Sequence, residues 1–294
     1  MLLSAPPVRT TATDGVLLVD KPSGVTSHDV VATARRVTRT RRIGHTGTLD
    51  PFATGLLILL VGRGTRLIQY VQDEPKVYDA TIRFGAETTT DDLTGEVTRE
   101  AELPSSDDVD RAIILLTGEI SQRPPDYSAK KVAGRRAYAA ARAGAPLALE
   151  TVPVTVHEWQ LRRRSPSEID VTITCGSGTY IRALARDLGR GVGSAAHLAS
   201  LRRTRSGVFD VANAASIEAL ERDGPVLLPL RSAIPQLPAQ TLSCEESERV
   251  RHGSTIPAQR DGDVIALFGA DGDLVSIAHR DGAMLQPRVV MHDV

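Results

Sequence analysis

The sequence predicts an α+β fold, in which a mixed and mainly antiparallel central sheet is flanked by helices. Residues 76–84 alternate in strand fashion, and the segments 152–162 and 169–175 have the pattern of two paired strands. The chain lacks the regular strand–helix repeat of doubly wound proteins. Its composition, 41% apolar and 24% charged, is that of an ordinary globular protein.

The N-terminal part combines short apolar runs with one helix. Residues 15–19 form an apolar run closed by a Pro/Gly turn, which predicts a buried strand. A helix is expected from about Ser27, with Ser27 as its N-cap and one apolar stripe made by Val30, Val31, Ala34 and Val37. A second core strand is expected at 55–61.

The middle of the chain contains two further helical patterns and an unusual insertion. Residues 107–117 and 180–189 have helical periodicity, and the second helix is expected to be short and amphipathic. Between them, residues 121–150 are basic, rich in alanine and interrupted by proline and glycine, with little apolar material to bury. This composition predicts a projecting insertion suited to gripping a substrate.

Three prolines near residues 230–239 indicate a domain boundary. We therefore expect a flexible N-terminus at 1–14, one large domain at 15–235 and a small β-rich domain at 240–294. The small domain is expected to hold a helix at 245–252 and strands at 264–268, 274–278 and 289–291.

The net charge of −1 conceals an uneven distribution of basic residues. One cluster, within residues 35–42, comprises Arg35, Arg36, Arg39, Arg41 and Arg42. A second cluster lies in the insertion and comprises Lys130, Lys131, Arg135, Arg136 and Arg142. Such clusters can follow the phosphates of a nucleic acid even in a neutral protein, because screening makes their field local. Solvated helix faces are the alternative for each cluster.

Missing motifs disfavour several classes of chemistry. No Walker loop is present, and Gly62-Arg63-Gly64 lacks the third glycine of a dinucleotide fingerprint. The seven histidines lack the paired spacing of zinc ligands, so we expect neither a metal nor an organic cofactor. The two cysteines, Cys175 and Cys244, suit a reducing compartment, and neither a signal peptide nor a membrane-spanning apolar run is recognisable. We therefore expect a cytoplasmic protein.

The loop from Gly44 to Asp50, followed by Pro51, is the densest chemistry-like feature. Its glycines permit tight turns and close approach to a ligand, and Pro51 biases Asp50 away from helical geometry. Residue types alone leave open that Asp50 only caps a turn or a helix.

The stretch Gly44–Gly55 closely resembles the active-site motif of bacterial tRNA pseudouridine-55 synthases, the TruB family. Further marks of this family follow the same order between about residues 15 and 210, and the tail resembles the PUA-type RNA-binding domain of the family. These marks are Gly15–Gly24, Tyr78 in its strand, Tyr127-Ser128-Ala129, Gly178–Arg182 and Leu201–Thr204.

The resemblance implies the pseudouridine synthase fold and one reaction. A uridine at position 55, in the loop of the tRNA T-arm, is flipped out, its uracil is detached from ribose C1′, and the ring is re-attached through C5. The resemblance assigns Asp50 as the nucleophile, which attacks either C1′ or C6. It assigns Arg182 as the ion-pair partner that aims Asp50, and Tyr78 as the residue that stacks on the base and helps to remove the C5 proton. Residue types alone leave open a surface ion pair for Arg182 and core packing for Tyr78.

The resemblance also implies a set of substrate-binding residues. Tyr180 and Leu201 are expected to line the pocket, His45 to contact RNA where the base leaves its stack, and Lys21 to support the site. Ordinary core packing of Leu201 and a solvated turn position for Lys21 are the alternatives. The basic residues of the insertion are expected to hold RNA phosphates, namely Lys130, Lys131, Arg135 and Arg136. The C-terminal domain is expected to touch the acceptor stem.

Two positions depart from the family pattern. Thr89 stands where relatives often carry an aspartate, and Lys130 replaces an apolar residue. Because both lie outside the catalytic motifs, they affect RNA contacts rather than the chemistry. Two rival hypotheses remain at this point: an enzyme of the same fold that acts on another RNA, and a non-catalytic RNA-binding or RNA-folding protein. A monomer is expected, since no interface stripe stands out.

Overall fold

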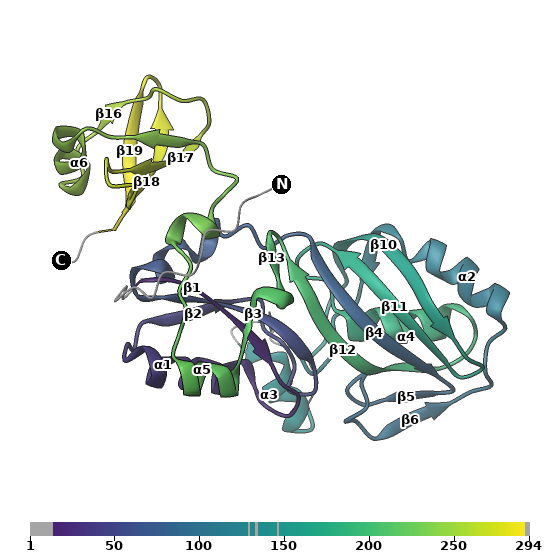
Figure 1. The fold of residues 1–294 in the computed structure, drawn as a ribbon. Coiled ribbons are helices and arrows are strands. Elements are labelled where there is room, and N and C mark those ends of the chain that lie inside the picture. The colour runs from purple at the N-terminus through teal and green to yellow at the C-terminus, as the bar shows by residue number, and fades with distance from the viewer. Residues whose placement is uncertain (1–13, 129, 133–134, 146, 292–294) are drawn as a thin grey trace.

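A computed structural model describes residues 14–128, 130–132, 135–145 and 147–291 of the chain (Figure 1). Its centre is a ten-stranded sheet in which the β1–β14 and β3–β12 pairs are parallel and the other pairs are antiparallel. The predicted mixed, mainly antiparallel sheet is thereby confirmed. The strand order is β14 (Ala215–Ser216), β1 (Gly15–Lys21), β3 (Thr54–Val61), β12 (Ala196–Ser206), β4 (Lys76–Phe84), β11 (Glu168–Cys175), β10 (Val152–Arg164) and β7 (Gly118–Gln122), with β13 (Phe209–Asp210) on β12 and β2 (Ile43–Thr46) on β3.

The β1–β3 half of the sheet is covered on both faces. Alternate residues of β3 pack against helices α1 (Ser27–Thr38) and α5 (Ile217–Asp223) on one face. The intervening residues of β3 face the opposite side of the sheet. They pack against the 3-10 segments η1 (Gly62–Tyr70), η2 (Val211–Asn213) and η3 (Leu230–Ala233) and against residues between 264 and 291. Burial on both faces explains why these strands are continuous apolar runs.

The other half of the sheet is covered on one face only. Helices α2 (Ser106–Leu115) and α4 (Ile181–Gly191) pack against β4, β11 and β12, whereas the opposite face carries polar side chains such as Thr81, Thr172 and Arg202. This one-sided burial produces the alternation seen in β4. The hairpin of β5 (Ala86–Thr88) and β6 (Val97–Glu100) lies beside this half.

Helix α1 is capped one residue earlier than predicted. The N-cap is Thr26, which forms a reciprocal capping box with Asp29. The prediction of Ser27 as the cap was wrong because this side chain has another partner. Its hydroxyl accepts a hydrogen bond from the Leu49 amide at 3.0 Å and donates to the Leu49 carbonyl at 3.1 Å.

Helix α4 is buried on more of its surface than an amphipathic surface helix. Eight of its eleven residues are buried, including Arg182 and Arg186. Both guanidinium groups face carboxylates from the turn between β5 and β6, so their charges are compensated inside the protein.

The predicted insertion, residues 121–150, begins within the last two residues of β7. Its described part contains the short hairpin of β8 (Lys131–Val132) and β9 (Arg135–Arg136), followed by helix α3 (Ala137–Arg142). Ala137 and Ala140 are buried, so small apolar residues anchor this segment.

The C-terminal segment forms a separate five-stranded sheet with one helix. The strand order is β15 (Ala239–Thr241), β17 (Val264–Phe268), β18 (Leu274–Asp281), β19 (Met284–Val290) and β16 (Ile256–Pro257), with α6 (Cys244–Arg251) beside them. Of the expected flexible segment at 1–14, residues 1–13 lie outside the described residues, and Asp14 forms an ion pair with Arg63. Among the described helices, none is both long enough and apolar enough to cross a membrane.

A continuous seam joins the C-terminal sheet to η1. Arg63 and Arg66 donate hydrogen bonds to the carbonyls of Met291 and Val290, and the Tyr70 hydroxyl lies 3.3 Å from Nε2 of His279. One apolar cluster includes residues from both sides of the seam, among them Leu67, Ile234, Ile277 and Met291.

Candidate active site

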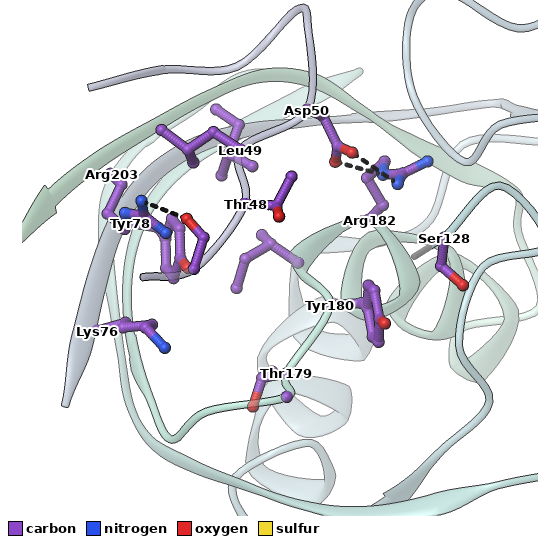
Figure 2. A pocket seen from close by; sticks show the side chains of 14 residues that line it. Thr48, Leu49, Asp50, Lys76, Tyr78, Ser128, Thr179, Tyr180, Arg182 and Arg203 are labelled. Carbon is purple, nitrogen blue, oxygen red and sulfur yellow. Dashed lines mark hydrogen bonds and ion pairs between the residues drawn. The ribbon is translucent and has the colours of Figure 1, made fainter. Parts of the chain in front are cut away.

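A cavity of about 300 Å³ opens between the sheet, the 47–50 loop and the start of α4 (Figure 2). This volume is at the lower end of the range for small-ligand sites, roughly 300–1,000 Å³. Four parts of the chain that are distant in sequence contribute its main walls: residues 47–50, β4, β12 and residues 178–182. Ser128 of the insertion adds to the rim.

Close contacts between β3 and β12, and between Ser27 and Leu49, hold the loop of residues 47–50. Gly55 has φ +102°, and a Cβ at this position would lie 2.2 Å from the Arg203 carbonyl oxygen on β12. Only glycine therefore lets β3 approach β12 at the base of the loop. The Ser27 hydroxyl, which bonds both backbone groups of Leu49, fixes the residue just before Asp50.

Asp50 and Arg182 form a two-pronged ion pair at one wall of the cavity. Nε of Arg182 lies 2.9 Å from Oδ2 of Asp50, and Nη2 lies 3.0 Å from Oδ1. The guanidinium is buried, with 5% of the side chain exposed, whereas the Asp50 side chain keeps 36% exposure. Figure 2 shows the two side chains pointing toward one another at this wall of the cavity. The carboxylate is thus fixed in direction but still reachable from the cavity.

Further contacts keep Arg182 in place. It donates to the Thr90 carbonyl at 2.9 Å and to the Tyr127 carbonyl at 2.8 Å, and its Nη1 lies 3.5 Å from Oδ2 of Asp92. Asp92 is buried and accepts hydrogen bonds from Thr90 and Thr94. The guanidinium therefore has partners around its whole edge and little freedom to leave Asp50.

Burial raises the pKa of the Asp50 carboxyl above its ordinary value. The charge of Arg182 opposes this shift, and the nearby Asp92 carboxylate adds to it. The carboxyl is consequently more basic than an exposed aspartate while it remains paired with a cation. Both properties favour a carboxylate that must attack an electrophile.

Tyr78 and Leu201 form the opposite, more apolar wall. Both are largely buried, and each belongs to the main core cluster as well as to the cavity lining, so packing and cavity roles coincide. Burial raises the pKa of the Tyr78 hydroxyl, whereas the adjacent Arg203 guanidinium lowers it. Arg203 is buried and donates to the carbonyls of Leu56 at 2.8 Å and Gly47 at 2.9 Å.

Lys21 lies beneath the loop and outside the cavity lining. It is fully buried, and its Nζ donates to the carbonyls of Pro22, Val25 and Pro51 at 2.9, 2.7 and 3.2 Å. Burial lowers the pKa of Lys21 from 10.5 to about 8, against the raising effect of Asp50. The alternative of a solvated turn lysine is wrong, because this side chain supports the loop from inside.

The remaining predicted residues lie at different distances from the cavity. Tyr180 lines it as the N-cap of α4, whereas His45 is half-buried on β2 and does not line it. Burial lowers the pKa of His45. The basic residues of the insertion lie in or next to its short hairpin, where Arg135 is exposed; the side chains of Lys131 and Arg136 lie outside the description.

Several residues at the site were not predicted. Lys76, Asp92 and Gln122 lie outside the quoted motifs, whereas Arg203 lies within the Leu201–Thr204 motif but was assigned no role. Only the strand alternation that places residues 76 and 78 on one face was a usable signal for Lys76. Within the described ranges, no three His, Cys, Asp or Glu side chains gather as metal ligands.

Two family models match consecutive parts of the chain. Residues 35–181 match the N-terminal domain of TruB family pseudouridylate synthases. Residues 182–232 match the C-terminal domain of tRNA pseudouridylate synthase B. The two matches together span more than half of the chain.

Whole-length comparisons agree with these matches. The chain is 46% identical over 291 residues to tRNA pseudouridine synthase B of Thermobifida fusca (strain YX), covering 94% of this chain and 98% of that protein. It is 40% identical over 284 residues to the protein of the same name from Mycobacterium tuberculosis (strain ATCC 25618 / H37Rv), covering 94% and 95%.

The structure comparison addresses the fold. The structure of an H/ACA RNP bound to a substrate RNA containing 2′-deoxyuridine contains a chain that matches with a TM-score of 0.71 at 21% identity, over 96% of this chain and 86% of that one. A Cbf5-Nop10-Gar1 complex matches with a TM-score of 0.71 at 24% identity. These matches confirm the predicted fold, and the chain belongs to the TruB family of pseudouridylate synthases.

Proposed function

We propose that this chain isomerises a uridine of tRNA to pseudouridine and that its target is position 55 in the loop of the T-arm. The observation that carries the proposal is the two-pronged Asp50–Arg182 ion pair at the wall of a cavity opposite Tyr78. Similarity to tRNA pseudouridine synthase B over 94% of the chain supports tRNA as the substrate.

We assign one step of the reaction to each residue of the site. The uridine leaves its stack at a cost of a few kcal/mol and enters the cavity. Asp50 either attacks C1′ and displaces N1 of the uracil, or adds to C6 before the C1′–N1 bond breaks, while Arg182 keeps the carboxylate ionised and aimed. The bond to Asp50 breaks again as the product forms, and the proton lost from C5 is balanced by one gained at N1. Tyr78 and Leu201 hold the freed uracil while it turns, so that C5 can bond to C1′.

The last chemical step removes the proton from C5. Tyr78 is the residue proposed to assist it, because its hydroxyl lies beside the Arg203 guanidinium, which stabilises a developing phenolate. The reaction exchanges a C–N bond for a C–C bond within one nucleotide. It therefore needs no external oxidant or reductant.

RNA binding is proposed to use the basic surfaces around the cavity. Arg39, Arg41 and Arg42 are exposed at the end of α1 and lead into β2 and the active-site loop. The insertion provides a second basic surface next to Ser128. We propose that these surfaces hold the phosphates of the T-arm and that the C-terminal domain contacts the acceptor stem. We also propose that the protein acts as a monomer.

The test is tritium release from a tRNA transcript labelled at uridine C5. The wild type is expected to release one tritium per tRNA, and mapping of the product should find pseudouridine at position 55. Asp50→Asn is expected to abolish release while it retains tRNA binding. Asp20→Asn is the matched control, because Asp20 forms a similar two-pronged pair with Arg202 outside the cavity. Full release by Asp50→Asn would rule out Asp50 as the nucleophile.

A further inference from the structure

Hydrogen bonds fasten the first segment of the insertion to α4 and to the residue before it. We call residues 122–127 the arm root. The fully buried Gln122 side chain accepts from the Tyr180 amide at 2.8 Å and donates to the Tyr180 carbonyl at 3.2 Å. Arg186 donates to the Arg123 carbonyl at 2.7 Å, and Arg182 donates to the Tyr127 carbonyl.

Arg186 repeats the arrangement of Arg182 one helical turn further along α4. It is buried, and its Nη1 lies 2.8 Å from Oδ2 of Asp91, the neighbour of Asp92. Its Nε donates to Asp187 at 2.9 Å. Asp91 has φ +58°, a left-handed conformation that aspartate tolerates better than most residues. One turn of the chain thus presents Asp91 to Arg186 and Asp92 to Arg182.

We propose that Arg186, held by Asp91, is a positioning residue that keeps the arm root in register with Arg182. When the insertion grips RNA, the arm root then transmits that contact to the Asp50–Arg182 pair. This inference rests on the proposed function. Neither Arg186 nor Asp91 lines the active-site cavity, so neither residue is expected to touch the reacting base.

One general argument and one observation favour positioning over simple stabilisation. A buried ion pair is often no more stabilising than apolar packing, so a large gain in stability is not expected from the Asp91–Arg186 pair. A second cavity of about 300 Å³ lies between the arm root and α4, with Asp91, Arg123 and Arg186 in its lining. Pro124 and Pro125 are buried, but space remains beside Arg123, so the hydrogen bond from Arg186 to the Arg123 carbonyl adds a directed contact where packing is incomplete.

The inference is tested on the full-length chain with Asp91→Asn and Arg186→Gln. Asparagine keeps the size and the left-handed tolerance of Asp91 but removes its charge, so this variant is expected to fold even if Arg186→Gln does not. Arg190→Gln is the matched control, since Arg190 lies one further turn along α4 and pairs with Glu87 without bonding the arm root.

Two quantities are measured: hydrogen exchange of the Tyr180 amide, which donates to Gln122 of the arm root, and the single-turnover rate at saturating tRNA. Asp91→Asn is expected to speed this exchange, because a loosened arm root releases the amide. It is expected to slow the single-turnover rate roughly 2- to 30-fold, the usual range for loss of coupling. At a pH well above the pKa of Asp91, the Arg190→Gln control should match the wild type in both. Unchanged exchange, or faster exchange with an unchanged rate, would overturn the inference.

The pH profile separates positioning from a merely structural role. Burial raises the pKa of Asp91 to about 6, against the lowering effects of Arg186, Arg182 and Arg190, and Asp187 raises it further. Below that pH the wild-type side chain is neutral, like asparagine. The ratio of wild-type to Asp91→Asn rates should therefore fall toward one as the pH drops through about 6, and a constant ratio would overturn the inference.

The two proposals fail in different ways. A wild type that releases no tritium from tRNA contradicts the proposed function. A wild type that releases tritium at the same single-turnover rate as Asp91→Asn and Arg186→Gln contradicts only the role of Arg186.

Discussion

Arg182 holds Asp50 through two different nitrogens, Nε at 2.9 Å and Nη2 at 3.0 Å, so the ion pair is fixed in direction as well as in distance. A lysine supplies charge but not this planar fork. Arg182→Lys is therefore expected to slow tritium release about 10²- to 10³-fold, the scale of losing one preorganised charge contact. Single-turnover assays at saturating tRNA measure the effect. Arg202→Lys, at the two-pronged pair with Asp20, is the control and should remain near wild type.

Tyr78 offers a test of the proton-removal step. Tyr78→Phe keeps an aromatic ring but removes the hydroxyl beside Arg203. We expect tRNA binding to persist and tritium release to slow about 10²- to 10⁴-fold, the usual contribution of a general base. Tyr78→Leu should add a binding defect, because it also removes the stacking surface. Wild-type tritium release by Tyr78→Phe would exclude the hydroxyl from the reaction.

The raised pKa of Asp50 predicts the acid side of the activity profile. The proposed reaction needs the ionised carboxylate, and burial places its pKa above the 3.8 of an ordinary aspartate. As the pH falls, the active form is therefore lost earlier than for an exposed carboxyl. The Asp91→Asn variant has no titrating group at position 91. The pH dependence of its single-turnover rate should therefore show only the fall in rate caused by protonation of Asp50. A flat profile down to pH 3.8 in a folded protein would contradict the expectation.

Lys21 is expected to contribute stability through the loop. Lys21→Met removes the side-chain donor to the carbonyls of Pro22 and Val25, and one of two donors to the Pro51 carbonyl, which also accepts from the Gly24 amide. A buried polar group left unsatisfied costs about 1–3 kcal/mol. Because Pro22 and Val25 are only partly buried, we expect the free energy of unfolding in urea to fall by about 1–3 kcal/mol in total. Lys130→Met, at a half-buried lysine of the insertion, should change it by less than about 0.5 kcal/mol. Equal stability of the two variants would show that Lys21 does not hold the loop.

Strand predictions succeeded where the two faces of a strand meet different surroundings. The bounds of β4 match the predicted 76–84, because its residues alternate between the core and a polar face. The C-terminal strand β19 begins five residues before the predicted 289, at Met284. The prediction missed the first part of this strand because Gln286 and Arg288 are polar and because a proline such as Pro287 usually excludes a central strand. In the structure, Pro287 pairs with Ala278 beside a register shift.

The site could be predicted only in part, because its contacts are long-range. Asp50 and Arg182 are 132 residues apart, so no spacing pattern connects them, and only the family resemblance suggested that they pair. Gln122 and Arg203 are polar residues whose burial depends on partners in other segments. A sequence pattern records which residues are apolar, but it does not record which buried polar groups find a partner.

The seam between η1 and the C-terminal sheet has a consequence for the length of RNA that the protein can span. Arg63 and Arg66 bond the last strand, and Leu67 and Ile277 belong to one apolar cluster across the seam. The two parts are therefore joined by hydrogen bonds and apolar contacts as well as by the chain. If both contact RNA, these seam contacts oppose a change in the distance from the cavity to the second contact. The seam would then favour a uridine that lies at a set distance from another part of the same folded RNA.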